Sequence, residues 1–149
     1  MPRQLLINLH LLAVILWLGG MFFAYFCLRP AAAQVLEPPQ RLPLWSAVFS
    51  RFLPMVAAAV IVILVTGSSM MVQTGFRNAP PGWHVMAALG SVMAVIFAWI
   101  YLLLFPRLRR HCAASSWPEA ARTLNAIRQL VGVNLALGVA TVVAALSAR

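Results

Sequence analysis

Two histidines, His10 and His84, are the side chains whose type and position could do chemistry in this chain. Each lies near the start of a long apolar run, and ionisable groups inside membrane helices are costly and by default indicate function. The two runs are expected to cross a membrane in the same direction, so both imidazoles approach one face at depths about a helical turn apart. Two imidazoles at matched depth on different helices can bind one metal ion or one haem iron. The alternative is two unrelated histidines that are bonded to backbone or water.

The surroundings of the two histidines extend the candidate site. Trp17 and either Gly20 or Met21 recur with His10 at helical spacing on one face of a helix, where a glycine lets a partner helix or a flat ligand approach closely. Three methionines are expected at the same end of the helices: Met70, Met71 and Met86. Thioethers and imidazoles together suit Cu(I), although methionine is also an ordinary flexible filler of apolar cores. Arg3 and Arg77, on the same side, are candidate partners for haem propionates.

These residues are held by segments that are apolar enough to cross a bilayer. Of the 149 residues, 63% are hydrophobic and only 9% are charged, which is too apolar for a soluble domain. A bilayer core requires about 20 apolar residues per helix, and four apolar segments qualify, at 5–28, 52–72, 85–105 and about 130–146. The helices themselves are expected at about 5–28, 52–72, 82–105 and 117–147. The sequence therefore predicts one all-α domain over residues 1–149, an integral membrane four-helix bundle. Prolines between residues 29 and 51 are expected to end helices.

The positive charge indicates how the bundle lies in its membrane. All 11 basic residues are arginines, and the formal net charge is +9. They lie in the connections and at segment ends rather than on one solvated face, which excludes nucleic acid as a partner. One side of the expected bundle carries Arg3, Arg77 and Arg149, and the other carries Arg29, Arg41, Arg51, Arg107, Arg109, Arg110, Arg122 and Arg128. Since cytoplasmic connections are enriched in arginine, both termini are expected in the periplasm of a bacterial inner membrane.

Other common site chemistries lack the residues to carry them. The only acids, Glu37 and Glu119, fall in connections, so proton transfer through intramembrane carboxylates is not expected. Cys27 and Cys112 match no metal-binding spacing. The polar residues inside the apolar segments are expected to form hydrogen bonds between helices: Thr66, Ser68, Ser69, Asn134 and Thr141.

One pattern in the first apolar segment matches a known family. It consists of a His, a Trp seven residues later, a Gly-Gly pair and a closing Arg-Pro, here His10, Trp17, Gly19-Gly20 and Arg29-Pro30. Three further segments share the likeness: LEPPQRLPLW at 36–45, RLRR at 107–110 and IRQLVGVNLALG at 127–138. In these features the chain resembles the small membrane proteins of the CopD-type copper-resistance family. The resemblance covers nearly the whole chain and implies copper uptake or copper handling.

A fainter likeness runs to the HemJ-type membrane proteins, which are linked to haem synthesis. They share the spacing of His10 and Trp17, and their third helix has a Trp-rich start with a His that is followed two residues later by Lys. The matching residues here are Trp83, His84 and Met86, so the Lys is missing. That difference argues against protoporphyrinogen oxidation.

Three functions are consistent with these residues. The favoured one is a membrane redox protein that binds haem b through His10 and His84, and it would be a haem-dependent oxidoreductase if it is catalytic. The second is a copper-handling protein that uses the histidines and methionines as ligands. The third is a structural or assembly subunit without a cofactor. Besides the lipid bilayer, the expected partner is a membrane or periplasmic redox protein or copper carrier, and the sequence leaves the oligomeric state open.

Overall fold

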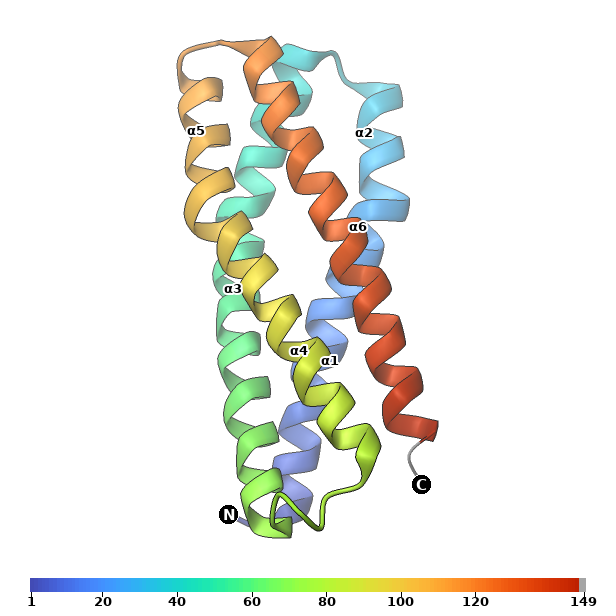
Figure 1. Cartoon of the computed structure of the whole chain (residues 1–149). Helices are drawn as coiled ribbons and strands as arrows, with labels where there is room; N and C mark the ends of the chain where they lie inside the picture. The colour runs from blue at the N-terminus through green and yellow to red at the C-terminus, as the bar shows by residue number, and fades with distance from the viewer. Residues whose placement is uncertain (148–149) are drawn as a thin grey trace.

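Helices make up all the regular structure of residues 1–147, the part of the chain that the computed structural model describes. The chain passes along the long axis of the molecule 4 times, and the four long segments pack into one elongated bundle (Figure 1). In order, the elements are α1 (Arg3–Phe23), the π-helical turn η1 (Ala24–Leu28), α2 (Arg29–Val35), α3 (Pro38–Thr74), α4 (Pro81–Trp99), the π-helical turn η2 (Ile100–Leu104), α5 (Phe105–Ala113) and α6 (Trp117–Ser147). The start of α1, the end of α6 and the α3–α4 connection lie at one end of the bundle, and α2 and α5 lie at the other (Figure 1).

Each of the four long segments is long and apolar enough to cross a membrane. They are Arg3–Val35, Pro38–Thr74, Pro81–Ala113 and Trp117–Ser147. The predicted all-α, multi-pass membrane bundle is therefore confirmed. About 20 residues are enough to cross the hydrocarbon, whereas these helices have 33, 37, 33 and 31 residues. The first three extend past the segments predicted from sequence, so their outer turns reach the headgroup layer or beyond.

The prediction that prolines between residues 29 and 51 end helices holds for Pro38 and Pro39, since α2 ends at Val35 and α3 begins at Pro38. For Pro30, in the first turn of α2, and Pro43, inside α3, it is wrong. A proline inside a helix lacks an N–H, and its ring collides with the carbonyl group four residues earlier. The first span avoids this collision by widening into η1, where the N–H of Arg29 donates to the carbonyl oxygen of Ala24.

The third span contains the same local structure. At the end of η2 the N–H of Phe105 donates to the carbonyl oxygen of Ile100, immediately before Pro106. Both spans also share the pattern Tyr-x-x-Leu-x-Pro, which starts at Tyr25 in the first and at Tyr101 in the third. The chain therefore places a π-helical turn at corresponding positions in two helices that run in the same direction (Figure 1).

The matched π-helical turns set a common register for the first and third spans. Counted back from the two tyrosines, His10 corresponds to Met86, and Trp17 corresponds to Met93. The stretches before the two turns are regular α-helices of equal rise, so the members of each pair lie at corresponding levels. His84 lies two residues nearer the start of its helix than Met86 does.

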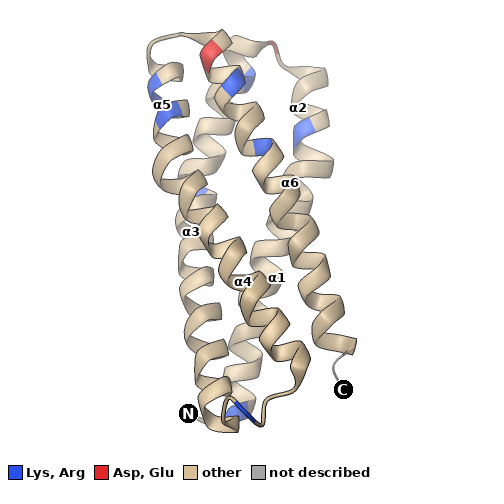
Figure 2. Cartoon of the chain, viewed as in Figure 1, with Lys and Arg blue, Asp and Glu red and all other residues tan. Residues whose placement is uncertain are grey.

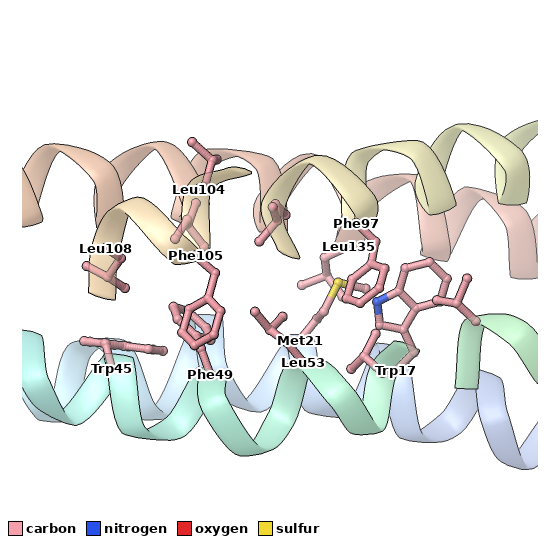
Figure 3. Packing of buried hydrophobic residues seen from close by; sticks show 14 of the residues in the cluster. Trp17, Met21, Trp45, Phe49, Leu53, Phe97, Leu104, Phe105, Leu108 and Leu135 are labelled. Carbon is pink, nitrogen blue, oxygen red and sulfur yellow. The ribbon is translucent and has the colours of Figure 1, made fainter. Parts of the chain in front are cut away.

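A layer of closely packed aromatic and aliphatic side chains fills the middle of the bundle (Figure 3). Trp17 is only 4% exposed and meets the edge of Phe97, with ring centroids 6.0 Å apart. Phe49 and Phe105 make a second edge contact at 6.3 Å, and Leu108 is completely buried beside them (Figure 3). Such edge-to-face aromatic contacts pack densely and resist deformation.

The charged residues are divided unequally between the two ends (Figure 2). Most arginines and both acids lie at the end that holds α2, α5 and the start of α6. Arg3 and Arg77 lie at the opposite end, where the guanidinium of Arg3 sits over the ring of Trp83, 5.5 Å from its centroid. Arg149 lies outside the described residues. The distribution follows the predicted arginine split, and the direction of the bundle across the membrane stays a prediction.

Candidate functional site

A cavity of about 310 Å³ lies between the four spans, in the half of the bundle that holds the start of α1 and the end of α6. Every long helix contributes to its lining, with His10 and Trp17 from α1, Gly67 and Met71 from α3, Met86 and Met93 from α4, and Gly138 and Thr141 from α6. Most of the lining is apolar, and His10 is its one ionisable side chain. An apolar cavity with a few convergent polar groups is the usual form of a ligand site.

His10 is held by a hydrogen bond that joins α1 to α3. Its Nδ1 lies 2.8 Å from Oγ1 of Thr66, a residue that is 3% exposed. The Thr66 hydroxyl has one proton, which it donates to the carbonyl oxygen of Val62 at 2.6 Å. The Thr66 oxygen is then left to accept from His10, and we therefore assign the ring proton to Nδ1. The prediction that Thr66 forms a hydrogen bond between helices is confirmed.

This tautomer leaves Nε2 of His10 with a free lone pair. An imidazole that is fixed through one nitrogen and open at the other is the usual state of a histidine metal ligand. Gly67 lies beside the ring, and a Cβ at that position would be 3.4 Å from Cε1 of His10. The ring is thus oriented by Thr66 and packed closely against α3 at Gly67.

Three thioether side chains line the same cavity. Met71 is 7% exposed and Met93 is 3% exposed, and Met86 is half-buried. Met86 and Met93 are two turns apart on one face of α4, at the levels that His10 and Trp17 occupy on α1. One histidine and three methionines, carried by three helices, therefore line the cavity.

Four of the predicted site residues lie outside this lining. His84 is exposed at the start of α4, and Arg77 is exposed in the α3–α4 connection. Met70 is buried but does not line the cavity. Gly20 faces the ring of Phe52, so its lack of a side chain accommodates helix packing.

Helix geometry explains why His84 is absent from the lining. It precedes Met86 by two residues, and two residues turn a helix by about 200°. The two side chains therefore point to nearly opposite sides of α4. The sequence indicated the depth of His84 but not its rotation around the helix axis. A ligand shared between His10 and His84 stays a prediction.

The donor set of the cavity favours a soft metal ion. Within residues 1–147, no three His, Cys, Asp or Glu side chains are grouped so that they could hold a metal ion. A zinc site usually needs three or four ligands of those types. One imidazole with thioether sulfurs is instead a ligand set that suits Cu(I).

Met93 is the lining methionine that the sequence analysis missed. It follows Met86 by seven residues, which repeats the spacing of His10 and Trp17. That signal was present in the sequence, but its meaning depends on the register that η1 and η2 set. The amide Nδ2 of Asn134 donates to the backbone carbonyl of Met93 at 3.2 Å and so joins α6 to α4, as predicted for this polar residue.

A family model described as CopD, Copper resistance protein D, matches residues 46–148. The match covers most of the chain and takes in Met71, Met86 and Met93, while α1 with His10 lies outside it. No curated protein and no solved structure matches the chain. The family match supports the CopD-type resemblance, and it gives no support to the HemJ-type one.

We expect the proton of neutral His10 to lie on Nδ1 in the purified protein. Nitrogen chemical shifts of isotope-labelled histidine distinguish the two tautomers. Thr66→Val keeps a similar shape but removes the acceptor, so the Nε2–H tautomer should become populated. Ser68→Ala is the matched control. Ser68 lines the same cavity, but the hydrogen bond of His10 is made to Thr66 and not to Ser68. A proton on Nε2 in the unsubstituted protein would contradict the assignment.

Proposed function

The chain belongs to the CopD family, and from that premise we propose that it is a multi-pass inner-membrane protein that binds Cu(I) in the cavity lined by His10. One observation carries the proposal. The hydrogen bond to Thr66 leaves Nε2 of His10 free in a cavity that also holds three thioethers. The ion is cargo that the protein exchanges with a copper carrier on the same side of the membrane.

Electrostatics favours Cu(I) over divalent ions at this position. The cavity offers neutral ligands, since thioethers carry no charge and His10 binds a metal as neutral imidazole. Burying a charge in an apolar environment is costly, and the cost is smaller for a single positive charge than for two. The softness of the sulfur donors points to the same ion.

The same residues favour copper over haem b. A haem with two histidine ligands needs a second imidazole that faces His10, and the exposed His84 lies outside the cavity lining. Arg77, one of the two predicted propionate partners, is exposed in a connection outside the cavity. His10 thus shares its cavity with soft donors, whereas the second imidazole that such a haem needs lies outside the lining.

The cavity serves one side of the membrane. The contact between Trp17 and Phe97 lies in the packed core (Figure 3). A second cavity, lined by Leu42 and Phe49 among others, shares no lining residue with the His10 cavity. The arginine-rich end belongs in the cytoplasm by the positive-inside rule. We therefore propose that Cu(I) enters the His10 cavity from the periplasmic side.

Cu(I) affinity tests the ligand set. His10→Ala should weaken binding at least tenfold, because even residues that only orient a metal ligand contribute about 10–100-fold. Met86→Leu and Met93→Leu conserve volume and should each cause a smaller loss, since the remaining thioethers still bind. Titration of the purified protein against a chromophoric Cu(I) chelator measures these affinities.

Met70→Leu is the matched control for the methionine variants. Met70 is a buried thioether next to Met71 in the sequence, but it does not line the cavity, so its loss should leave Cu(I) affinity unchanged. Equal losses in Met70→Leu and Met86→Leu would contradict the proposed site. A purified protein with a Soret band that disappears in His10→Ala or His84→Ala would contradict copper and favour haem b.

Reporter fusions test the direction of the bundle. A phosphatase that is active only in the periplasm should be active when it is fused after Arg149. The same phosphatase should be silent when it is inserted at Ser115, in the connection between α5 and α6, because that connection lies at the arginine-rich end. The reverse pattern would place the His10 cavity on the cytoplasmic side.

A further inference from the structure

A second cavity, of about 300 Å³, lies at the arginine-rich end of the bundle between η1, α2, α3 and α6. Apolar and aromatic side chains form much of its wall, among them Leu42, Phe49 and Val131. Its charged lining consists of three arginines: Arg29, Arg41 and Arg128. The cavity shares no lining residue with the His10 cavity, so an inference from it does not depend on copper binding.

These three arginines differ from all others in residues 1–147. Every other arginine there is exposed, whereas Arg29, Arg41 and Arg128 are half-buried. They come from α2, α3 and α6 and converge on one cavity. The chain's only acids, Glu37 and Glu119, are exposed and do not line it. Three positive charges therefore meet without a carboxylate to balance them.

Arg128 also carries a buried donor that has no partner. Its Nε is enclosed, and no acceptor among the described residues bonds to it. Buried donors are normally bonded, because an unpaired one loses its hydration without compensation. The guanidinium of Arg29 lies over the ring of Tyr25, 5.6 Å from its centroid, which orients it at the cavity wall. An anionic ligand would satisfy both the charge and the missing hydrogen bond.

We propose that this cavity binds the phosphate group of an anionic membrane phospholipid. Guanidinium groups match phosphate oxygens in a bidentate geometry, and basic pockets between membrane helices bind such headgroups. The phosphate oxygens provide the acceptor that Nε of Arg128 lacks. The apolar wall at Leu42 and Phe49 accommodates the first part of an acyl chain.

The position of the cavity favours a lipid over a free phosphate ion. The arginines lie at the end where the helices extend beyond the ~20 residues that cross the hydrocarbon, which is the level of the headgroups (Figure 2). A free phosphate ion would neutralise the arginines but leave the apolar wall uncovered. A phospholipid covers both parts of the cavity at once.

Lipid binding by the full chain in a neutral detergent tests this site. Phosphatidylglycerol should remain bound in native mass spectrometry and raise the melting temperature, and phosphatidylcholine should do so much less. Each guanidinium that is removed should weaken phosphatidylglycerol binding roughly fivefold, so the double variant Arg41→Gln with Arg128→Gln should lose most of it. Inorganic phosphate, added alone, should stabilise neither protein.

The matched control is Arg109→Gln with Arg122→Gln, which removes two exposed arginines at the same end of the bundle. It should keep phosphatidylglycerol binding, and an equal loss in this control would overturn the site. Full stabilisation by inorganic phosphate would overturn the lipid assignment. If the double glutamine variant does not fold, Arg41→Lys with Arg128→Lys keeps the charge but not the planar fork. Unchanged affinity in that lysine variant would overturn the guanidinium–phosphate contact.

Discussion

The hydrogen bond from His10 to Thr66 joins the first two spans in a region where water is scarce and cannot replace it. Its direction is set by the backbone of α3, because Thr66 donates its own proton to the carbonyl of Val62. With His10 assigned as the donor from Nδ1, the lone pair of Nε2 remains for a ligand. The tautomer of His10 thus depends on Thr66, whose hydroxyl is bonded to the backbone of its own helix. A histidine without a partner of this kind would have no fixed tautomer.

The prolines of the first and third spans decide which side chains share the cavity with His10. Each π-helical turn adds one residue to a helix and so changes the rotation of the preceding turns by about 100°. Because η1 and η2 occur at matching positions, the two helices keep the same register, and Met86 comes to the level of His10. A widened turn in only one span would rotate one of the two side chains out of the cavity.

The length of each apolar run follows from the thickness of the bilayer, so the four spans could be predicted from the sequence. It could also be predicted that Thr66 forms a hydrogen bond to another helix, because a polar side chain in hydrocarbon is stabilised by such a bond. The direction in which His84 points around the axis of α4 could not be predicted, because it depends on the residue at which α4 begins and on η2. The convergence of Arg29 and Arg128 depends on the packing of α2 near α6, which no local pattern encodes.

One imidazole and several thioether sulfurs should bind the same Cu(I) ion, and X-ray absorption at the copper edge measures that shell most directly. Nitrogen and sulfur neighbours differ in distance and scattering strength, so their contributions separate. We expect a mixed shell of nitrogen and sulfur in the Cu(I)-loaded protein. The sulfur contribution should disappear when Met71, Met86 and Met93 are all replaced by leucine. A shell of nitrogen and oxygen alone, unchanged in that triple variant, would contradict copper binding by the methionines of this cavity.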